Sequence, residues 1–334
     1  MPSIDRIEIN GPNAELCIDF VNHKRSMGYK VDVGKIYMLR SISEAAEAYR
    51  PAGDDSVLPR EAVLQWIEPR GEEAMGTRHN RASMIRNFGL FLQSNGYDAY
   101  VLPNNMLPKC SSDFQPYIFT HAEIQELARI FDAIPYDKRY PDRHLVVPML
   151  FRTLYGCGLR LGEALNLAAC DVDMRDDVLA IRHAKGEKNR FVPMSKSLAA
   201  EFARYWENMR FAEGPADRVI FPSPEKRIVP YTEQAVRKVF KEAYATLKLS
   251  TVKGDLPRVH DLRHTFACHA LDAAAERGED PYALLPVLAS YLGHSSVQDT
   301  MRYLHLTEES RRRIVNTMAA FDESIFPEVD YDAI

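Results

Sequence analysis

The sequence predicts a mainly helical protein with two domains, the second of which is α+β and carries a small antiparallel sheet. The chain has 334 residues, more than the roughly 100–200 residues of one typical domain. Apolar stretches bounded by glycine and proline fill most of it, and one pair of short β-type segments flanks a polar turn. Residues 101–117 are rich in proline, asparagine and serine and lack periodicity, which is typical of a linker.

Four helices are expected in the first domain, residues 1–100. Each helical stretch ends where glycine or proline follows, because these residues interrupt the hydrogen-bonding pattern of a helix. The expected helices cover residues 14–27, 33–49, 59–67 and 75–94. The residues before them contain no apolar run of the kind found in a signal peptide.

The second domain, residues 118–306, is expected to begin with a helix. Thr120 and Glu123 have the spacing of a capping box, in which each side chain accepts a bond from the other residue's backbone N–H. This helix is expected to reach residue 133. A long apolar helix is expected to follow at residues 142–156.

The middle of this domain combines a glycine turn with a hairpin. The segment Gly156-Cys157-Gly158 permits a sharp entry into a helix that carries Arg160 and Glu163. The predicted strands, at residues 178–181 and 190–193, are joined by a turn at 185–189. Two further helices are expected at residues 196–209 and 233–247. The remaining residues, 307–334, contain a short amphipathic pattern at 310–321 and then an acidic tail.

The five cysteines are scattered and form no Cys-x-x-Cys pair. This pattern argues for a reducing, cytoplasmic environment and against a disulfide framework or a zinc site. No stretch approaches the roughly 20 apolar residues of a membrane span. No cluster of Asp and Glu suits Mg²⁺, so no metal or other cofactor is expected.

The formal net charge of −5 is unusual for a nucleic-acid-binding protein. Its distribution weakens this objection, because no Lys or Arg follows Arg313 whereas five acidic residues do. Phosphates respond to local patches of charge and not to the sum over the whole chain. Binding to DNA therefore remains compatible with the composition.

Six polar residues stand out along the second domain. Taken alone, each has an ordinary explanation, such as an ion pair on one helix, a solvated turn lysine, a helix-capping histidine or a half-buried tyrosine. Taken together, their types and order are specific. In chain order they are Arg160, Lys185, His260, Arg263, His294 and Tyr303.

In this order the six residues resemble the catalytic domain of tyrosine site-specific recombinases, the phage integrase and Xer recombinase family. The resemblance covers residues 118–306 and extends more loosely over 14–96, which are similar to the family's SAM-like core-binding domain. The segments that carry it are Gly158-Leu159-Arg160, Ala184-Lys185-Gly186, His260-Asp261-Leu262-Arg263-His264-Thr265-Phe266, Leu292-Gly293-His294-Ser295-Ser296 and Tyr303.

The resemblance implies that Tyr303 attacks the phosphorus of a phosphodiester. The products are a 3′-phosphotyrosyl link and a free 5′-hydroxyl, and the link conserves the bond energy, so that no ATP is needed. Arg160 and Arg263 would bind the non-bridging oxygens and offset the charge gained in the transition state. A cationic pocket would also favour the phenolate, since a free tyrosine has a pKa of about 10.

The same resemblance assigns the remaining positions to proton transfer and phosphate binding. Lys185 would protonate the departing 5′-oxygen, with Lys188 in the same turn as a competing choice. His260 would assist proton transfer, and His294 would orient or hydrogen-bond the phosphate. The arginines and the lysine would do the work that a metal does elsewhere.

The expected partner is double-stranded DNA with a specific, inverted-repeat site, bound by a tetramer of this chain. In the resembling family the C-terminal segment often docks on a neighbouring protomer, and such an exchange is expected here. Candidate DNA contacts in the first domain are Lys35, Arg40, Arg78, Arg81 and Arg86, for which a solvated basic face is the alternative. Two other functions remain open, namely a relaxing enzyme similar to type IB topoisomerases and a DNA-binding accessory protein or repressor.

Overall fold

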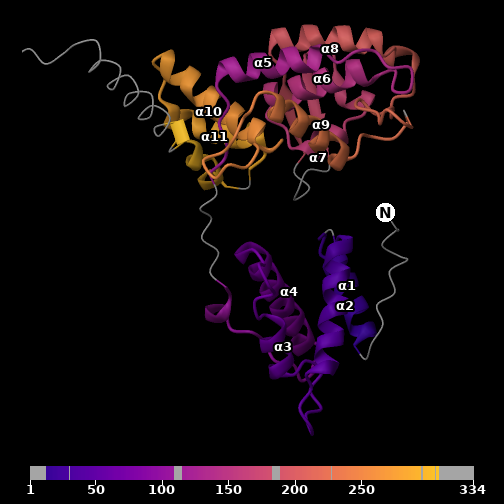
Figure 1. The fold of residues 1–334 in the computed structure, drawn as a ribbon, viewed down its shortest axis with the longest axis vertical. Helices are drawn as coiled ribbons and strands as arrows, with labels where there is room; N and C mark the ends of the chain where they lie inside the picture. Colours follow the sequence, from indigo (N-terminus) through magenta and orange to yellow (C-terminus); the bar gives the residue numbers. More distant parts are fainter. Residues whose placement is uncertain are drawn as a thin grey trace, which may run out of the picture. The chain divides into compact units, whose positions relative to one another are not determined.

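The computed structural model describes residues 13–29, 31–108, 115–182, 189–226, 228–294, 296–304 and 306–307. The chain divides into two compact units, Met1–Phe114 and Gln115–Ile334, and Figure 1 shows the elements of each. Lys185 and Lys188 lie outside the described residues, as does the expected helix at 310–321. The mainly helical fold with one small antiparallel sheet confirms the predicted fold class.

The first unit is a group of helices around one apolar core. All four predicted helices are present, and their ends differ from the expected ones by only a residue or two. Phe20 and Phe88 meet edge to face at the centre of the core, with ring centroids 5.5 Å apart. The helices are α1 (Ala14–Ser26), α2 (Val33–Ala48), α3 (Arg60–Trp66) and α4 (Met75–Ser94), followed by a 3₁₀ turn at Asn104–Met106.

The second unit contains helices α5 to α11, further helical residues at 298–304 and a three-stranded sheet. The predicted capping box is confirmed, because Thr120 and Glu123 exchange side-chain and backbone hydrogen bonds of 2.7 and 3.2 Å. The helices are α5 (His121–Asp132), α6 (Arg143–Gly156), α7 (Leu161–Leu165), α8 (Lys196–Asn208), α9 (Glu233–Thr246), α10 (Asp261–Glu276) and α11 (Pro281–Leu292).

The sheet has the strand order β1 (Val172–Asp173), β2 (Val178–Ile181) and β3 (Arg190–Pro193), with both pairs antiparallel. The predicted hairpin is therefore present as β2 and β3, and Ile181 is the register partner of Arg190. The sequence did not predict β1, because a strand of two residues has no alternating pattern to detect.

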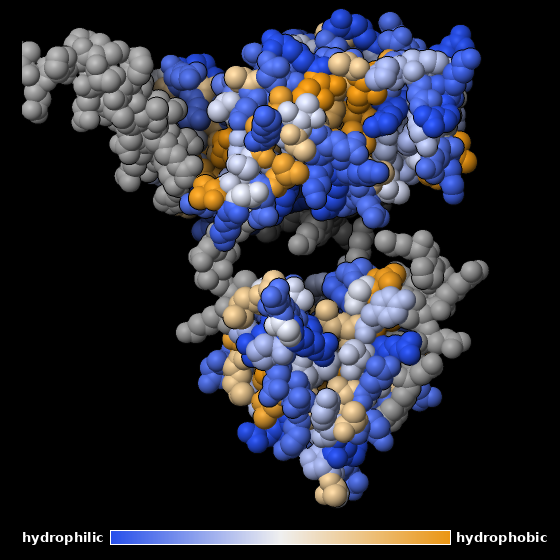
Figure 2. Space-filling view, in the orientation of Figure 1, coloured by the Kyte–Doolittle hydropathy of each residue, from blue (hydrophilic) through white to orange (hydrophobic). Residues whose placement is uncertain are grey.

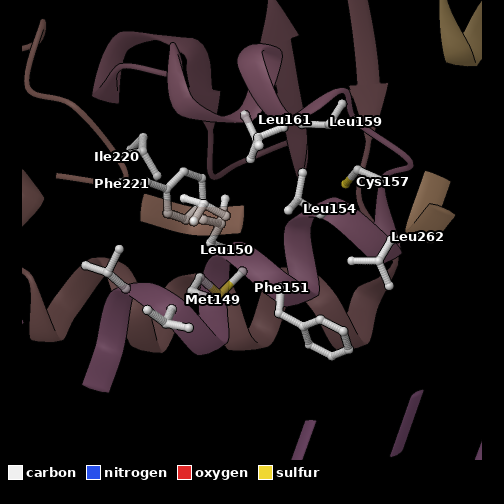
Figure 3. Close-up of a cluster of buried hydrophobic side chains, with 14 of the residues drawn as sticks. Met149, Leu150, Phe151, Leu154, Cys157, Leu159, Leu161, Ile220, Phe221 and Leu262 are labelled. Atoms are coloured by element: carbon white, nitrogen blue, oxygen red, sulfur yellow. The ribbon is translucent and has the colours of Figure 1, made fainter. Parts of the chain in front are cut away.

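Helix α6 lies at the centre of the second unit and is buried on most of its faces. Figure 3 shows Met149, Leu150, Phe151 and Leu154 of this helix among apolar side chains from several other segments. A helix that is apolar on nearly every side is stable only when other elements surround it. The position of its C-terminal end, which leads to Arg160, is therefore set by the core.

The turn after α6 requires glycine at position 158. Gly158 has φ of +57°, and a Cβ there would come within 2.5 Å of the Phe266 ring and 3.0 Å of Leu292. Phe266 belongs to α10 and Leu292 to α11, so the turn packs directly against both helices. This close approach brings Arg160 toward the ends of α10 and α11.

Figure 2 shows hydrophilic residues over most of the visible face of each unit, interrupted on the second unit by hydrophobic patches. The described cysteines are all free, and none of the described helices is both long and apolar enough to cross a membrane.

We expect Gly158→Ala to destabilise the protein by about 2–4 kcal/mol, because it adds both backbone strain at positive φ and a clash with Phe266. The measurement is chemical unfolding followed by circular dichroism. Gly254→Ala is the matched control, since Gly254 also has positive φ but has no atom within 4 Å of an added Cβ. Equal losses in the two variants would show that close packing at Gly158 is unimportant.

Candidate active site

Three arginine side chains converge on the C-terminal end of α11. The last carbonyl groups of a helix have no partner within the helix and carry partial negative charge, so they attract cations. Here three successive carbonyls each accept a hydrogen bond from a different arginine. The pairs are Tyr291 with Arg190 Nε (2.8 Å), Leu292 with Arg263 Nη2 (2.7 Å) and Gly293 with Arg160 Nη2 (3.3 Å).

Glu163 is the buried anion of this cluster. Its Oε1 accepts hydrogen bonds from Arg160 Nη1 at 2.7 Å and from Arg190 Nη1 at 3.1 Å. Its Oε2 accepts bonds from Arg190 Nη2 at 2.7 Å and from the backbone N–H of Arg160 at 3.0 Å. Burial raises the pKa of Glu163, but the bonds and charge of Arg190 and then those of Arg160 outweigh it and hold the pKa at about 2.

The two predicted arginines differ in exposure. Arg160 stands at the start of α7, and its side chain is 28% exposed, so it is partly accessible. Arg263, in the first turn of α10, is only 1% exposed, and its Nη1 donates to the carbonyl of Gly158 at 2.8 Å. Burial and then the charge of Arg160 lower the pKa of Arg263 to about 10, which leaves it protonated at neutral pH.

Tyr303 is enclosed next to this cluster. It is 2% exposed, and its hydroxyl lies 3.1 Å from Nδ1 of His264. Its ring centroid lies 5.6 Å from that of His264 and 6.0 Å from that of His294. Burial raises the pKa of Tyr303, and this effect exceeds the opposing charge of Arg263. The phenol is therefore neutral and shielded from solvent in this structure.

Two histidines, His264 and His294, flank the tyrosine, and the ring centroid of His260 lies 4.8 Å from that of His264. His260 stands at the N-terminal end of α10 and is exposed, whereas His264, one turn later, is buried. His294 follows Gly293, and its Nδ1 lies 2.7 Å from Oγ1 of Thr300. Burial, followed by neighbouring positive charges, lowers the pKa of His294 to about 4; burial, and then His260 and nearby arginines, lower that of His264 to about 3.

Five of the six predicted site residues lie in the described part of the chain, and the structure brings them around the end of α11. Lys185 lies outside that part, in the segment between β2 and β3. Arg190 and His264 received no role from sequence. His264 directly follows Arg263 in the segment that carries the resemblance, but Arg190 is far in sequence from each of its side-chain partners.

The candidate DNA contacts of the first unit have varied surroundings. Arg81 is 4% exposed and bonds Glu73 and the carbonyls of Trp66 and Glu68, so it contacts DNA only if this arrangement opens. The other four are half-buried or lie at the surface. Arg78 and Arg86 are half-buried and donate to the carbonyls of Ile67 and Leu102, while Lys35 and Arg40 lie at the surface of α2 beside Asp32 and Glu44.

We expect His264 and His294 to remain neutral at pH 6, because burial and nearby positive charges penalise their protonated forms. They gain protons only near pH 4 and below, whereas in the unfolded chain they do so near pH 6.5. The free energy of unfolding should therefore decrease as the pH falls from about 6.5 to about 4. Imidazole NMR titration, assigned with single His→Gln variants, measures this. Midpoints near 6.5 would contradict it.

Comparisons with known proteins agree on one family. Residues 119–310 match the phage integrase family. The chain is 30% identical over 310 residues to the putative integrase/recombinase y4rB of Sinorhizobium fredii, covering 89% of this chain and 95% of that protein. It is 28% identical over 258 residues to the tyrosine recombinase XerC of Halalkalibacterium halodurans, covering 74% and 76%.

Solved structures of recombinases share the fold. The XerH site-specific recombinase bound to its difH substrate matches with a TM-score of 0.62 and 15% identity, over 92% of this chain and 97% of that one. A lambda integrase dimer bound to a core site matches with a TM-score of 0.57 and 14% identity, over 85% and 95%.

Proposed function

Because the chain belongs to the phage integrase family, we propose that it is a site-specific tyrosine recombinase that cuts and rejoins DNA through Tyr303. The family catalyses DNA cleavage and rejoining. The observation that carries the assignment to residues is the convergence of Arg160, Arg263, His294 and Tyr303 at one helix end. Two cations beside a phenol suit the binding and attack of a phosphodiester.

The scissile phosphate binds to the accessible part of Arg160. The guanidinium groups of Arg160 and Arg263 donate to its non-bridging oxygens, and His294 donates a further hydrogen bond. Arg263 is almost fully buried and its Nη atoms already hold two backbone carbonyls, so its orientation is fixed before DNA arrives. A preorganised cation stabilises the transition state without a reorganisation cost at the moment of reaction.

Tyr303 must leave His264 before it attacks. In the reaction its oxygen forms a bond to phosphorus while the bond from phosphorus to the 5′-oxygen breaks. The phenolic proton passes to a base, for which His260 is the candidate, and Lys185 protonates the departing oxygen. Attack by a 5′-hydroxyl on the phosphotyrosine reverses these steps and rejoins the strand.

The substrate is double-stranded DNA with an inverted-repeat site, on which four copies of the chain assemble. The DNA-bound states of the XerH and lambda integrase structures support a DNA partner, and the latter holds a dimer on a core site. The first unit adds phosphate contacts, for which the exposed Lys35 and Arg40 are placed best. The proposed role is in a mobile element, since one relative is described as a putative integrase/recombinase. A cytoplasmic location follows from the scattered cysteines of the sequence.

The comparisons favour a recombinase over the two other functions considered from the sequence, since the relatives named above are recombinases or a putative integrase. A relaxing enzyme would change the linking number of supercoiled DNA without recombinant products. A binding protein would form no covalent adduct.

We expect wild-type protein to form covalent adducts at a few discrete genomic sites, and Tyr303→Phe to form none, because the variant lacks the nucleophilic oxygen. Cells that hold the source genome express either protein, denaturation removes non-covalent complexes, and the attached DNA is sequenced. Lys185→Ala serves as a second probe, since loss of the leaving-group acid slows cleavage without removing the nucleophile. Adducts in Tyr303→Phe at the wild-type sites would overturn the assignment of the nucleophile, and no adduct with any of the three proteins would favour a binding protein.

We expect deletion of residues 308–334 to abolish cooperative assembly on a two-arm site, because this segment docks on a neighbouring copy. Electrophoretic mobility shifts with one-arm and two-arm DNA separate single binding from cooperative binding. Binding to one arm should change by less than about threefold. If cooperativity survives the deletion, the segment does not join the protomers.

A further inference from the structure

All three guanidinium nitrogens of Arg190 donate hydrogen bonds within the protein. The sequence did not predict that this residue touches DNA. It begins β3, and its side chain is 9% exposed. Both of its Nη atoms bond the two oxygens of Glu163, while Nε donates to the carbonyl of Tyr291. A planar guanidinium that forks onto a carboxylate holds that group in one orientation, which a lysine does not reproduce.

Arg190 and Arg160 compete for the same anion. Oε1 of Glu163 lies 2.7 Å from Arg160 and 3.1 Å from Arg190, and Oε2 lies 2.7 Å from Arg190. Without the charge of Arg190, both oxygens of Glu163 become available to Arg160. Arg263 Nη1 lies farther from Glu163, 3.9 Å from Oε2, so the carboxylate would then pair mainly with Arg160. Such a pair cancels the charge that the phosphate needs and holds the guanidinium away from it.

A second contact fixes Arg190 against the end of α11. Gly293 has φ of +69°, and a Cβ at this position would lie 2.9 Å from Nη1 of Arg190 and 3.1 Å from its Cδ and Cζ. The guanidinium therefore fills the space that any other residue at 293 would need. At the other end of β3, the hydroxyl of Tyr291 donates to the carbonyl of Pro193 at 3.0 Å, so both ends of the strand are tied to one residue of α11.

We propose that Arg190 is a positioning residue for DNA cleavage, which neutralises Glu163 so that Arg160 keeps its charge for the scissile phosphate. The proposal rests on the proposed function, because it concerns the same phosphate site. It predicts that the damage caused by losing Arg190 comes mainly from the uncompensated carboxylate. A second substitution that removes this carboxylate should therefore restore activity.

The test is a double-mutant cycle of wild type, Arg190→Gln, Glu163→Gln and the double variant. The substrate is a nicked duplex that carries the site found by adduct sequencing, and the readout is the single-turnover rate of covalent adduct formation. We expect Arg190→Gln to lower this rate by about 100-fold. The double variant should form the adduct at least about tenfold faster than Arg190→Gln, because an uncharged amide at position 163 cannot neutralise Arg160.

Arg152→Gln is the matched control. Arg152 also forks onto one carboxylate, that of Asp132, with two distances of 2.7 Å, but it joins α5 to α6. Its loss should leave the cleavage rate unchanged. Circular dichroism of every variant shows whether it is folded, and Arg190→Lys, which keeps the charge, should cleave faster than Arg190→Gln.

Two results would overturn the role of Arg190. Cleavage by Arg190→Gln at the wild-type rate would show that Arg160 does not depend on it. A double variant that is folded but no faster than Arg190→Gln would show that its effect does not pass through Glu163. Failure of the proposed function can be distinguished from both results, because the wild-type protein itself would then form no adduct.

Discussion

The capped end of α11 is the contact on which the active site depends. Three guanidinium groups come from three distant segments, the start of α7, the start of β3 and the first turn of α10, and each holds one carbonyl of the same helix end. Cations repel one another, so their assembly needs negative charge nearby. The helix end and Glu163 supply it.

The three arginines of this arrangement differ in whether their charged groups are buried or accessible. The side chains of Arg263 and Arg190 are buried and form their hydrogen bonds inside the protein, whereas that of Arg160 is partly exposed. Breaking a buried ion pair on one side usually destabilises a protein by about 3–5 kcal/mol, because it leaves an uncompensated charge. Loss of Glu163 is therefore expected to destabilise the fold as well as to change the charge of the site. Its hydrogen bonds connect the buried Arg190 with Arg160, the residue proposed to bind the phosphate.

The sequence predicted the local features of this fold well. The helix ends, the Thr120 capping box and the hairpin follow from short-range patterns, which residues close in sequence determine. The six residues of the candidate site were predicted from their types and their order along the chain, and five of them lie in the described part. Arg190 was missed because its partners Glu163 and Tyr291 lie 27 and 101 positions away. Burial of Arg81 was missed for the same reason, since Trp66 and Glu73 enclose it from neighbouring segments.

The enclosure of Tyr303 has a consequence for DNA affinity. In the proposed reaction the phenol leaves His264 and its apolar surroundings before it attacks, which imposes a cost on the bound complex, and contacts away from the scissile phosphate have to supply that free energy. The measured binding constant then reports the strength of those contacts minus the cost of releasing the tyrosine. DNA that makes too few such contacts would occupy the proposed site and remain uncut.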